Sequence, residues 1–401
     1  MQEPKPQAIL PPKDNEPVLR VGIVLEEDQK QTVRFKIPEG EYTLCSDNQR
    51  VALSSNTEYT ASNNQTEILV SDASNQPVIK SRTALKLLVA SAPPVKAVSG
   101  IMFDSIVAGR GFHWEKVLPL TFSGSFEFIP KDASIILVNT VNFEDYLASV
   151  ISSEMGSCCP VEFSKALAVA SRSWATVFLG HKHPDAPFAI CNDDDCQRYQ
   201  GTTHLSQLAI DAVQACRGEF LTCPDETVCP GYYSKICGGF SEKAEHAFGF
   251  EVAGLAAVPD FPVQGSCTLN LGENLSDEAN FTAWLNGGEE SFCSAATVKE
   301  ADYQQYLGAV DVSGTYFRWD YSISAKDLVR NLSNKFNLND ISQVTGFRLG
   351  PRGTSGRVLN LTVDYLTKAG TQQELYLENQ YDIRRALHPS FLYSTAFIHT
   401  F

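Results

Sequence analysis

The pattern of apolar residues changes at Asn139, where strand-like segments give way to helical ones. From Val18 to about Ala97, short apolar runs such as VLRVGIVL, TVRFKI and ALKLLVA alternate with turns rich in Asn, Gln and Gly, and further runs continue to Asn139. This alternation is typical of a β-rich domain. The residues that follow carry apolar side chains at the 3.6-residue period of helices. A chain that joins the two parts in this order is predicted to be an α+β protein.

The same pattern divides the chain. Residues 1–17 are polar and Pro-rich and are expected to be a disordered tail or linker. Residues 18–100 are predicted to form a small β-rich domain, and residues 101–401 a mixed α/β core. Residues of about 250–320 have no clear period, and we interpret them as an insertion into that core.

The core is expected to begin with a pair of helices. The first covers residues 142–155 and stops at Gly156, and the second covers residues 160–179. Their short connection favours an αα-hairpin. A third helix is expected over residues 206–216, followed by strands at EFLTC and GYYSKIC and by a turn at Gly238–Gly239. After the insertion we expect a helix capped by Ser324 and three strands.

A carboxylate falls on the apolar face of the first helix. Glu154 takes the next position in a series with helical spacing, made of Phe143, Tyr146, Leu147, Val150 and Ile151. Burial and the negative end of the helix dipole both favour a protonated carboxyl there. A neutral carboxylic acid near pH 7 is suited to general-acid catalysis. The alternative is a solvated, paired glutamate at a helix end.

Charge and cysteine content restrict the function and the compartment. The net charge of −15 argues against nucleic acid as the main partner. Ten of the eleven cysteines lie between Cys158 and Cys293, which indicates an extracytoplasmic protein with some disulfides and a metal site. Cys223–Cys229 and Cys267–Cys293 are candidate bridges. No apolar run is long enough to span a bilayer, but the Pro-rich start is typical of the linker that follows a membrane anchor; the alternative is a cytosolic protein.

Five ordered blocks resemble the SpoIID/LytB family of cell-wall proteins. They are NTVNFEDYLASVISSEM, KALAVASRSWA, CNDDDCQRYQG, AIDAVQACRGEFLT and GYYSKICGGFSEKAEHAFG, and RVGIVL, AGRGFHWEK, SGRVLNLTV and IRRALHPSFLYS add to the likeness. The resemblance runs from about Gly109 to the C-terminus, without the insertion. It implies a helical hairpin packed on a sheet, unlike the lysozyme fold.

The resemblance implies a lytic transglycosylase acting on peptidoglycan, with Glu154 at the position of the family's catalytic glutamate. Ordinary glycosidases need two carboxylates. A lytic transglycosylase needs one, because the muramic sugar's own primary hydroxyl captures the oxocarbenium-like centre and yields an anhydro-sugar. If Glu242 or Glu245 opposes Glu154, a hydrolytic muramidase becomes the alternative.

Other residues match family positions in the glycan cleft. Arg172 is suited to gripping the lactyl carboxylate or to holding cleft geometry, with a solvent-facing helix residue as the alternative. Aromatic residues of the matched blocks are suited to stacking on sugars, with a place in the core as the alternative. The matched positions that we expect to bind substrate are Arg172, Gln197, Tyr199, Tyr232, Tyr233, Ser234, Gly238, Gly239 and Glu242.

A loop rich in Cys and His is a candidate metal site. His181, His183, Cys191 and Cys196 have the spacing H-x-H-x7-C-x4-C, which is compatible with a structural zinc site. Family members that bind zinc carry His directly before the second cysteine; here that residue is Asp195, so one ligand is altered and His181, His183 or Asp195 would replace it. The alternative is a Cys191–Cys196 disulfide.

The resemblance also implies partners and a location. Glycan strands stripped of stem peptides are the expected substrate, so a cell-wall amidase is expected to act first. The protein is expected to be periplasmic or otherwise extracytoplasmic, held by an anchor outside this chain. Two other functions stay open: a non-catalytic module that binds peptidoglycan or enhances an amidase, and a zinc-dependent hydrolase, against which two thiolates and no H-E-x-x-H argue.

Overall fold

The computed structural model describes residues 16–38, 41–89, 95–112, 114–156, 158–252, 254–261, 274–287, 290–308 and 314–400. The chain divides into two compact units. Gln2–Tyr233 with Gln304–Val312 form the first, here called the N-terminal unit, and Ser234–Tyr303 with Ser313–Phe401 form the C-terminal unit. Over the described ranges, no helix combines the length and hydrophobicity needed to cross a membrane.

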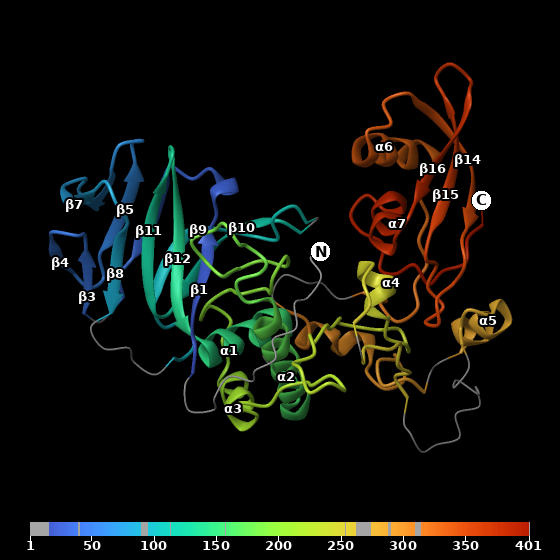
Figure 1. The fold of residues 1–401 in the computed structure, drawn as a ribbon, viewed down its shortest axis with the longest axis horizontal. Helices are drawn as coiled ribbons and strands as arrows, with labels where there is room; N and C mark the ends of the chain where they lie inside the picture. Colours follow the sequence, from blue (N-terminus) through green and yellow to red (C-terminus); the bar gives the residue numbers. More distant parts are fainter. Residues whose placement is uncertain are drawn as a thin grey trace. The chain divides into compact units, whose positions relative to one another are not determined.

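Two β-sheets make up most of the N-terminal unit (Figure 1). The first has the order β13-β1-β12-β11-β8-β3-β4, with β13 (Ile190–Cys191), β1 (Val18–Val24), β12 (Ser134–Asn142), β11 (Ser125–Lys131), β8 (Leu85–Val89), β3 (Tyr42–Cys45) and β4 (Arg50–Leu53). The second has the order β10-β9-β2-β5-β6-β7, with β10 (Lys116–Phe122), β9 (Ile101–Ala108), β2 (Thr32–Lys36), β5 (Glu58–Asn63), β6 (Ile68–Asp72) and β7 (Pro77–Ser81). A short 3-10 helix, η1 (Glu26–Asp28), joins β1 to β2.

Aromatic side chains from both sheets meet in one core. The ring centroid of Phe35 on β2 lies 5.3 Å from that of Phe128 on β11, and the centroid of Phe103 on β9 lies 5.0 Å from that of Phe126. All four rings are buried. The strands alternate buried and more exposed residues, as β5 does over its six positions, so each sheet turns one face to this core.

The sheets join segments that the sequence analysis assigned to different domains. Strand β1 pairs with β12 in antiparallel register, and β2 pairs with β9. Residues 18–100 therefore share both sheets with residues 101–142, and the boundary expected near residue 100 does not separate two compact units. The local pattern of apolar residues does not show which distant strands will pair. Strands β4, β5, β7 and β9 were also not predicted from that pattern.

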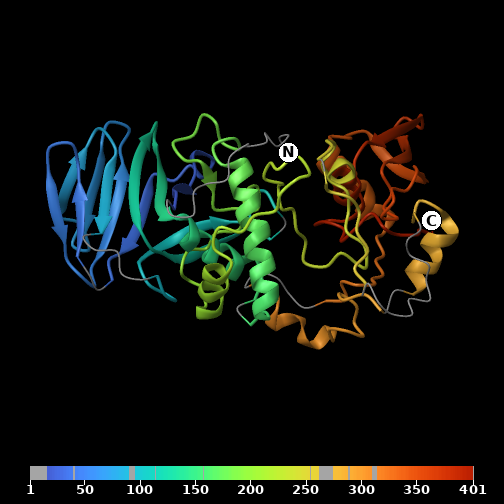
Figure 2. The ribbon, with the colours of Figure 1, turned by 60° about the horizontal axis from the view of Figure 1, so that its bottom comes forward.

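Three helices follow the sheets and pack against one another. They are α1 (Phe143–Glu154), α2 (Val161–Phe178) and α3 (Gln207–Ala215). Helix α1 starts directly after β12 and contacts β12 and β1, and Figure 2 shows α2 along its length. These helices lie where the sequence predicted them. The α+β class, with a β-rich part followed by a mixed part, is confirmed.

The first turn of α1 carries a partly buried carboxylate, that of Asp145, whose negative charge is unfavourable in the folded protein. Burial, and next the charge of Glu16, raise the pKa of Asp145 to about 6. A carboxyl whose pKa is raised in the fold opposes folding when it is ionised, so this penalty is complete above about pH 6 and disappears as the pH falls towards 4.

We therefore expect Asp145→Asn to raise the free energy of unfolding at pH 7.5 by about 1–2 kcal/mol, less than the full shift would give because the side chain is partly exposed. At pH 4 the variant and the wild type should be equally stable. Urea unfolding at both pH values measures this, with the exposed Asp132→Asn as control. An equal gain at both pH values would contradict the electrostatic origin.

The C-terminal unit is built on a small antiparallel sheet of β14 (Ile341–Leu349), β15 (Leu361–Thr367) and β16 (Gln372–Leu377). Helices α6 (Ala325–Phe336) and α7 (Gln380–Leu387) share its core. Three further elements complete the description: α4 (Ala244–Phe248), α5 (Glu278–Asn286) and the 3-10 helix η2 (Glu300–Gln305), which runs across the division between the units.

Predictions for this half of the chain are partly confirmed. The Ser324 side chain caps α6 by accepting a hydrogen bond from the Asp327 main chain, and β14, β15 and β16 lie where three strands were expected. The strands predicted at EFLTC and GYYSKIC are wrong, because only an isolated bridge between Thr222 and Val228 forms there. Helices α5 and α7 were not predicted.

Candidate active site and metal group

Glu154 is the last residue of α1 and is half-buried. Its Oε1 accepts a hydrogen bond from the main-chain N–H of Arg198 at 3.0 Å and another from the hydroxyl of Tyr233 at 3.2 Å. Burial, and next the charge of Glu154, raise the pKa of Tyr233 well above its usual value, so this hydroxyl keeps its proton. The structure thus brings together two predicted site residues and adds a main-chain donor that was not predicted.

Residues 305–308, which are far from α1 in the sequence, contact the C-terminal end of that helix. The main-chain N–H of Gly156 donates to the carbonyl of Tyr306 at 2.9 Å. A β-carbon on Gly156 would overlap the Gln305 carbonyl, and one on Gly308 would overlap the Ser153 carbonyl. Gly156 follows the end of the helix, as expected, and its lack of a side chain permits this close backbone approach.

Arg172 lies inside the protein. Its guanidinium is 0% exposed and donates to both carboxylate oxygens of Glu144, from Nε at 3.1 Å and from Nη2 at 2.6 Å, and to the carbonyl of Glu219 at 3.2 Å. In this position the side chain does not reach a glycan, so the lactyl-carboxylate contact has no support, and the solvent-facing alternative is wrong. The pair joins α1 to α2, which agrees with a role in holding the geometry.

Two more predicted substrate ligands are interior residues. Gln197 is 2% exposed, accepts a hydrogen bond from the hydroxyl of Tyr146 at 3.1 Å and donates to the carbonyl of Ser171 at 3.2 Å. Tyr199 is 1% exposed and donates to Asn139 Oδ1 at 2.7 Å. Both therefore support the protein wall behind Glu154, and for Tyr199 the structure favours the core alternative.

The remaining predicted ligands have varied settings. Tyr232 is half-buried, and its ring lies 6.2 Å from that of Phe178. Ser234, Gly238, Gly239 and Glu242 belong to the C-terminal unit.

Within the C-terminal unit these residues have different roles. Ser234 is exposed. Gly238 and Gly239 form the expected turn, with φ of 72° and 106°. Glu242 Oε2 accepts hydrogen bonds from Ser355 and Gln380, each at 2.7 Å. These contacts give Glu242 a structural task in joining three segments of its unit.

The Cys/His loop gathers four candidate ligands. His183, Cys191, Asp195 and Cys196 place their ligand atoms within 4.8 Å of one another. Asp195 occupies the place predicted for His181, which is not part of the group. The thiol of Cys196 lies 3.4 Å from His183 Nε2, which lies 3.8 Å from Asp195 Oδ2. Ligands of a tetrahedral zinc ion with usual bond lengths are about 3.4–3.8 Å apart, so the donor set and spacing fit that ion.

The two thiols of this group differ in acidity, since burial raises the pKa of Cys196 well above its usual value. A hydrogen bond from the Cys196 thiol lowers the pKa of Cys191 to about 6, against the effect of burial. The thiolate form therefore predominates at neutral pH, and a thiolate is the form that binds metal. No disulfide joins Cys191 to Cys196 or Cys223 to Cys229. The predicted Cys267–Cys293 bridge includes a residue outside the described ranges.

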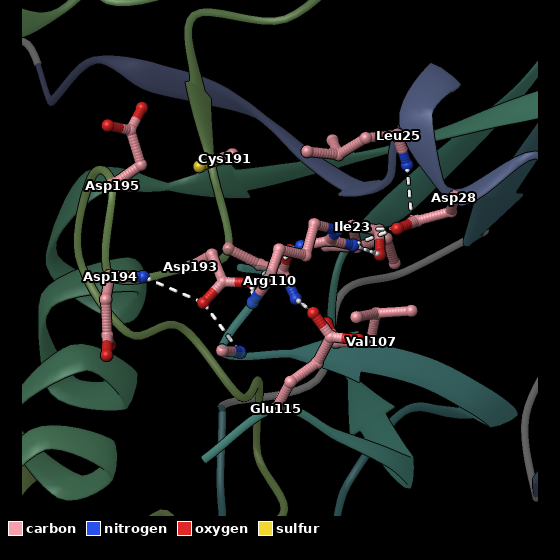
Figure 3. Close-up of polar contacts among 12 residues, drawn as sticks. Ile23, Leu25, Asp28, Val107, Arg110, Glu115, Cys191, Asp193, Asp194 and Asp195 are labelled. Carbon is pink, nitrogen blue, oxygen red and sulfur yellow. Dashed lines mark hydrogen bonds and ion pairs between the residues drawn. The ribbon is translucent and has the colours of Figure 1, made fainter. Parts of the chain in front are cut away.

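A half-buried arginine fixes the segment between the two cysteines (Figure 3). Arg110 donates to Asp28 Oδ1 at 2.7 Å, to Asp193 Oδ2 at 2.9 Å and to Asn192 Oδ1 at 2.7 Å. The main-chain N–H of Gly109 also donates to Asp193, at 2.7 Å. Sequence reasoning noted the AGRGFHWEK segment but assigned Arg110 no role.

The same loop continues to the main-chain donor that holds Glu154. Trp114 Nε1 donates to Asp194 Oδ2 at 2.8 Å. The Arg198 guanidinium lies 4.3 Å from the centroid of the Trp114 ring, and Arg198 Nε donates to Asp194 at 3.2 Å. Cys196 and Arg198 are two residues apart. The candidate ligand Cys196 and the main-chain donor to Glu154 therefore belong to one loop.

Comparison with known proteins finds a family model that covers the candidate site. Residues 131–223 match the model described as SpoIID, stage II sporulation protein. This segment contains Glu154 and the whole metal group, and the family is one of cell-wall proteins that act outside the cytoplasm. Residues 265–400 match a model described as a domain of unknown function.

An uncharacterised protein of Brachyspira hyodysenteriae is 31% identical over 190 residues, which are 47% of this chain and 49% of that protein. The chain thus spans about half the length of this relative.

Proposed function

We propose that this protein is a lytic transglycosylase that cleaves the bond between N-acetylmuramic acid and N-acetylglucosamine in glycan strands. One observation carries the proposal: the SpoIID segment ends its first helix with a half-buried carboxyl that two fixed donors orient. The substrate is a strand without stem peptides, so an amidase supplies it. The reaction takes place outside the cytoplasm.

The contacts of Glu154 are suited to a single acid that later becomes the base. The protonated Glu154 carboxyl passes its proton to the glycosidic oxygen. The muramic primary hydroxyl then attacks the oxocarbenium-like carbon and gives its proton to the Glu154 carboxylate. Between these steps the Arg198 N–H and the Tyr233 hydroxyl stabilise the carboxylate. No water is consumed.

Zinc fits the metal group as a structural ion. His183, Cys191, Asp195 and Cys196 would hold it, and four protein ligands leave no position for a catalytic water. When bound, the ion supplies no reaction chemistry beyond fixing the loop. That loop orients the Arg198 N–H toward Glu154.

Removal of the metal is therefore expected to lower both stability and activity. Dialysis against a strong chelator should lower the melting temperature by several degrees and reduce turnover, and added Zn²⁺ should restore both. Elemental analysis before and after dialysis, with melting followed by circular dichroism, measures this. Cys196→Ser should reproduce the effect, whereas Cys158→Ser, at an exposed thiol, should not. Full activity and stability of the zinc-free protein would contradict a structural role.

The reaction itself is tested by mass spectrometry of muropeptides. Peptidoglycan is first treated with an amidase and then digested with the protein. Disaccharides that end in anhydro-muramic acid are the expected product. Reducing ends would replace the proposal by a muramidase with a second carboxylate. Absence of products, with the protein still sedimenting with the glycan, would replace it by a binding module.

A further inference from the structure

The C-terminal unit holds a second group of metal-type ligands. Cys237, Asp260 and Cys293 come from three separate segments, and their ligand atoms all lie within 4.8 Å of one another. The two sulfur atoms are 3.7 Å apart, and all three residues are half-buried. The group lies outside residues 131–223, and neither of the roles proposed above uses it.

Main-chain hydrogen bonds hold two of the three residues, Asp260 and Cys293, in place. The N–H of Asp260 donates to the Gly239 carbonyl at 3.0 Å, and the N–H of Cys293 donates to Asp260 Oδ2 at 3.0 Å. The N–H of Phe292 donates to the Asp260 carbonyl at 3.1 Å. One carboxylate oxygen is therefore fixed beside the second thiol, in the way that outer hydrogen bonds orient metal-ligating carboxylates.

Two guanidinium groups border this group of ligands. Arg318 donates to the Gly238 carbonyl at 3.0 Å, and Arg357 donates to the Cys237 carbonyl at 2.9 Å. Both arginines are half-buried. Two thiolates and a carboxylate around a divalent cation keep one negative charge, which would compensate these partly desolvated arginines.

We propose that Cys237, Asp260 and Cys293 bind a zinc-type divalent cation. The sulfur separation matches the spacing of about 3.8 Å between two thiolates on a tetrahedral zinc ion. Two thiolates select a softer ion over Mg²⁺ or Ca²⁺. A disulfide would need sulfur atoms about 2.0 Å apart and would not need the carboxylate. Three protein ligands leave one position for water or another donor, and the ion would join the Gly238–Gly239 turn to two distant segments.

Cobalt titration of the full chain tests this site. In reduced protein carrying Cys191→Ser and Cys196→Ser, one equivalent of Co²⁺ should bind with a thiolate-to-cobalt charge-transfer band. Adding Cys237→Ser or Cys293→Ser should abolish the band, and Asp260→Asn should weaken Co²⁺ binding at least about ten-fold. Cys45→Ser, at the half-buried thiol of β3, is the control and should change nothing.

Two results would overturn the proposal. One is absence of a thiolate band in the reduced double variant while its circular dichroism matches the wild type. The other is recovery of a linked Cys237–Cys293 peptide from protein alkylated during lysis, which would assign a disulfide. If the double variant does not fold, the zinc content of single variants is measured by elemental analysis instead. The Cys293→Ser protein should contain one equivalent of zinc less than the Cys45→Ser protein. Equal zinc contents would refute the site.

Discussion

Glu154→Gln is expected to reduce the release of anhydro-ended disaccharides roughly 100- to 10,000-fold, the range that a general acid–base residue contributes. The amide has no proton acidic enough to reach the glycosidic oxygen. Its side-chain oxygen still accepts hydrogen bonds, so the contacts with Arg198 and Tyr233 can persist. Binding of the glycan and the melting temperature should therefore stay close to those of the wild type. Mass spectrometry of the released muropeptides measures the loss.

The matched control is Glu162→Gln, which changes an exposed glutamate of α2 in the same way. This variant should retain full activity. An active Glu154→Gln protein would remove Glu154 from the reaction and leave the cell-wall family assignment intact. Loss of both activity and folding in this variant would instead give Glu154 a structural role.

Arg172→Met is expected to lower the free energy of unfolding by about 3–5 kcal/mol. The substitution leaves the Glu144 carboxylate buried without the guanidinium that both its oxygens contact, and an uncompensated buried charge has a cost of this order. Arg172→Met with Glu144→Leu should recover much of the loss, because an apolar pair needs no compensation. Urea unfolding of the three proteins gives the values.

Arg34→Met provides the comparison, since the Arg34 side chain is 69% exposed and its substitution should cost less than about 0.5 kcal/mol. The same series separates two roles for Arg172. A residue that grips substrate would lose glycan affinity at unchanged stability. A residue that joins α1 to α2 would lose stability first, and we expect this second outcome.

Local patterns predicted the elements around Glu154 well. The helical period placed Glu154 at the end of α1 because contacts within a helix join residues three and four apart in the sequence. The Ser324 cap and the turn at Gly238 were predicted for the same reason.

Features that depend on distant residues were not predicted. Nothing near Arg172 in the sequence reveals that Glu144, on another helix, makes it a buried ion pair. The choice of Asp195 over His181 depends on how the loop folds back on itself, and the Arg198 main-chain donor has no side-chain signature. The strand expected at GYYSKIC has strand-like residues but no strand beside it.

The contact between Gly156 and the segment around Tyr306 has a consequence for how the protein is made. Synthesis passes through residues 2–233 and then through Ser234–Tyr303 of the C-terminal unit before it supplies the residues that close the end of α1. During synthesis from the N-terminus, the helix end that carries Glu154 stays unfinished until residue 308 has been added. A product truncated after Tyr233 would contain every residue proposed for the reaction, but it would lack the segment around Tyr306 that contacts Gly156. We therefore expect partial chains on the ribosome to be inactive.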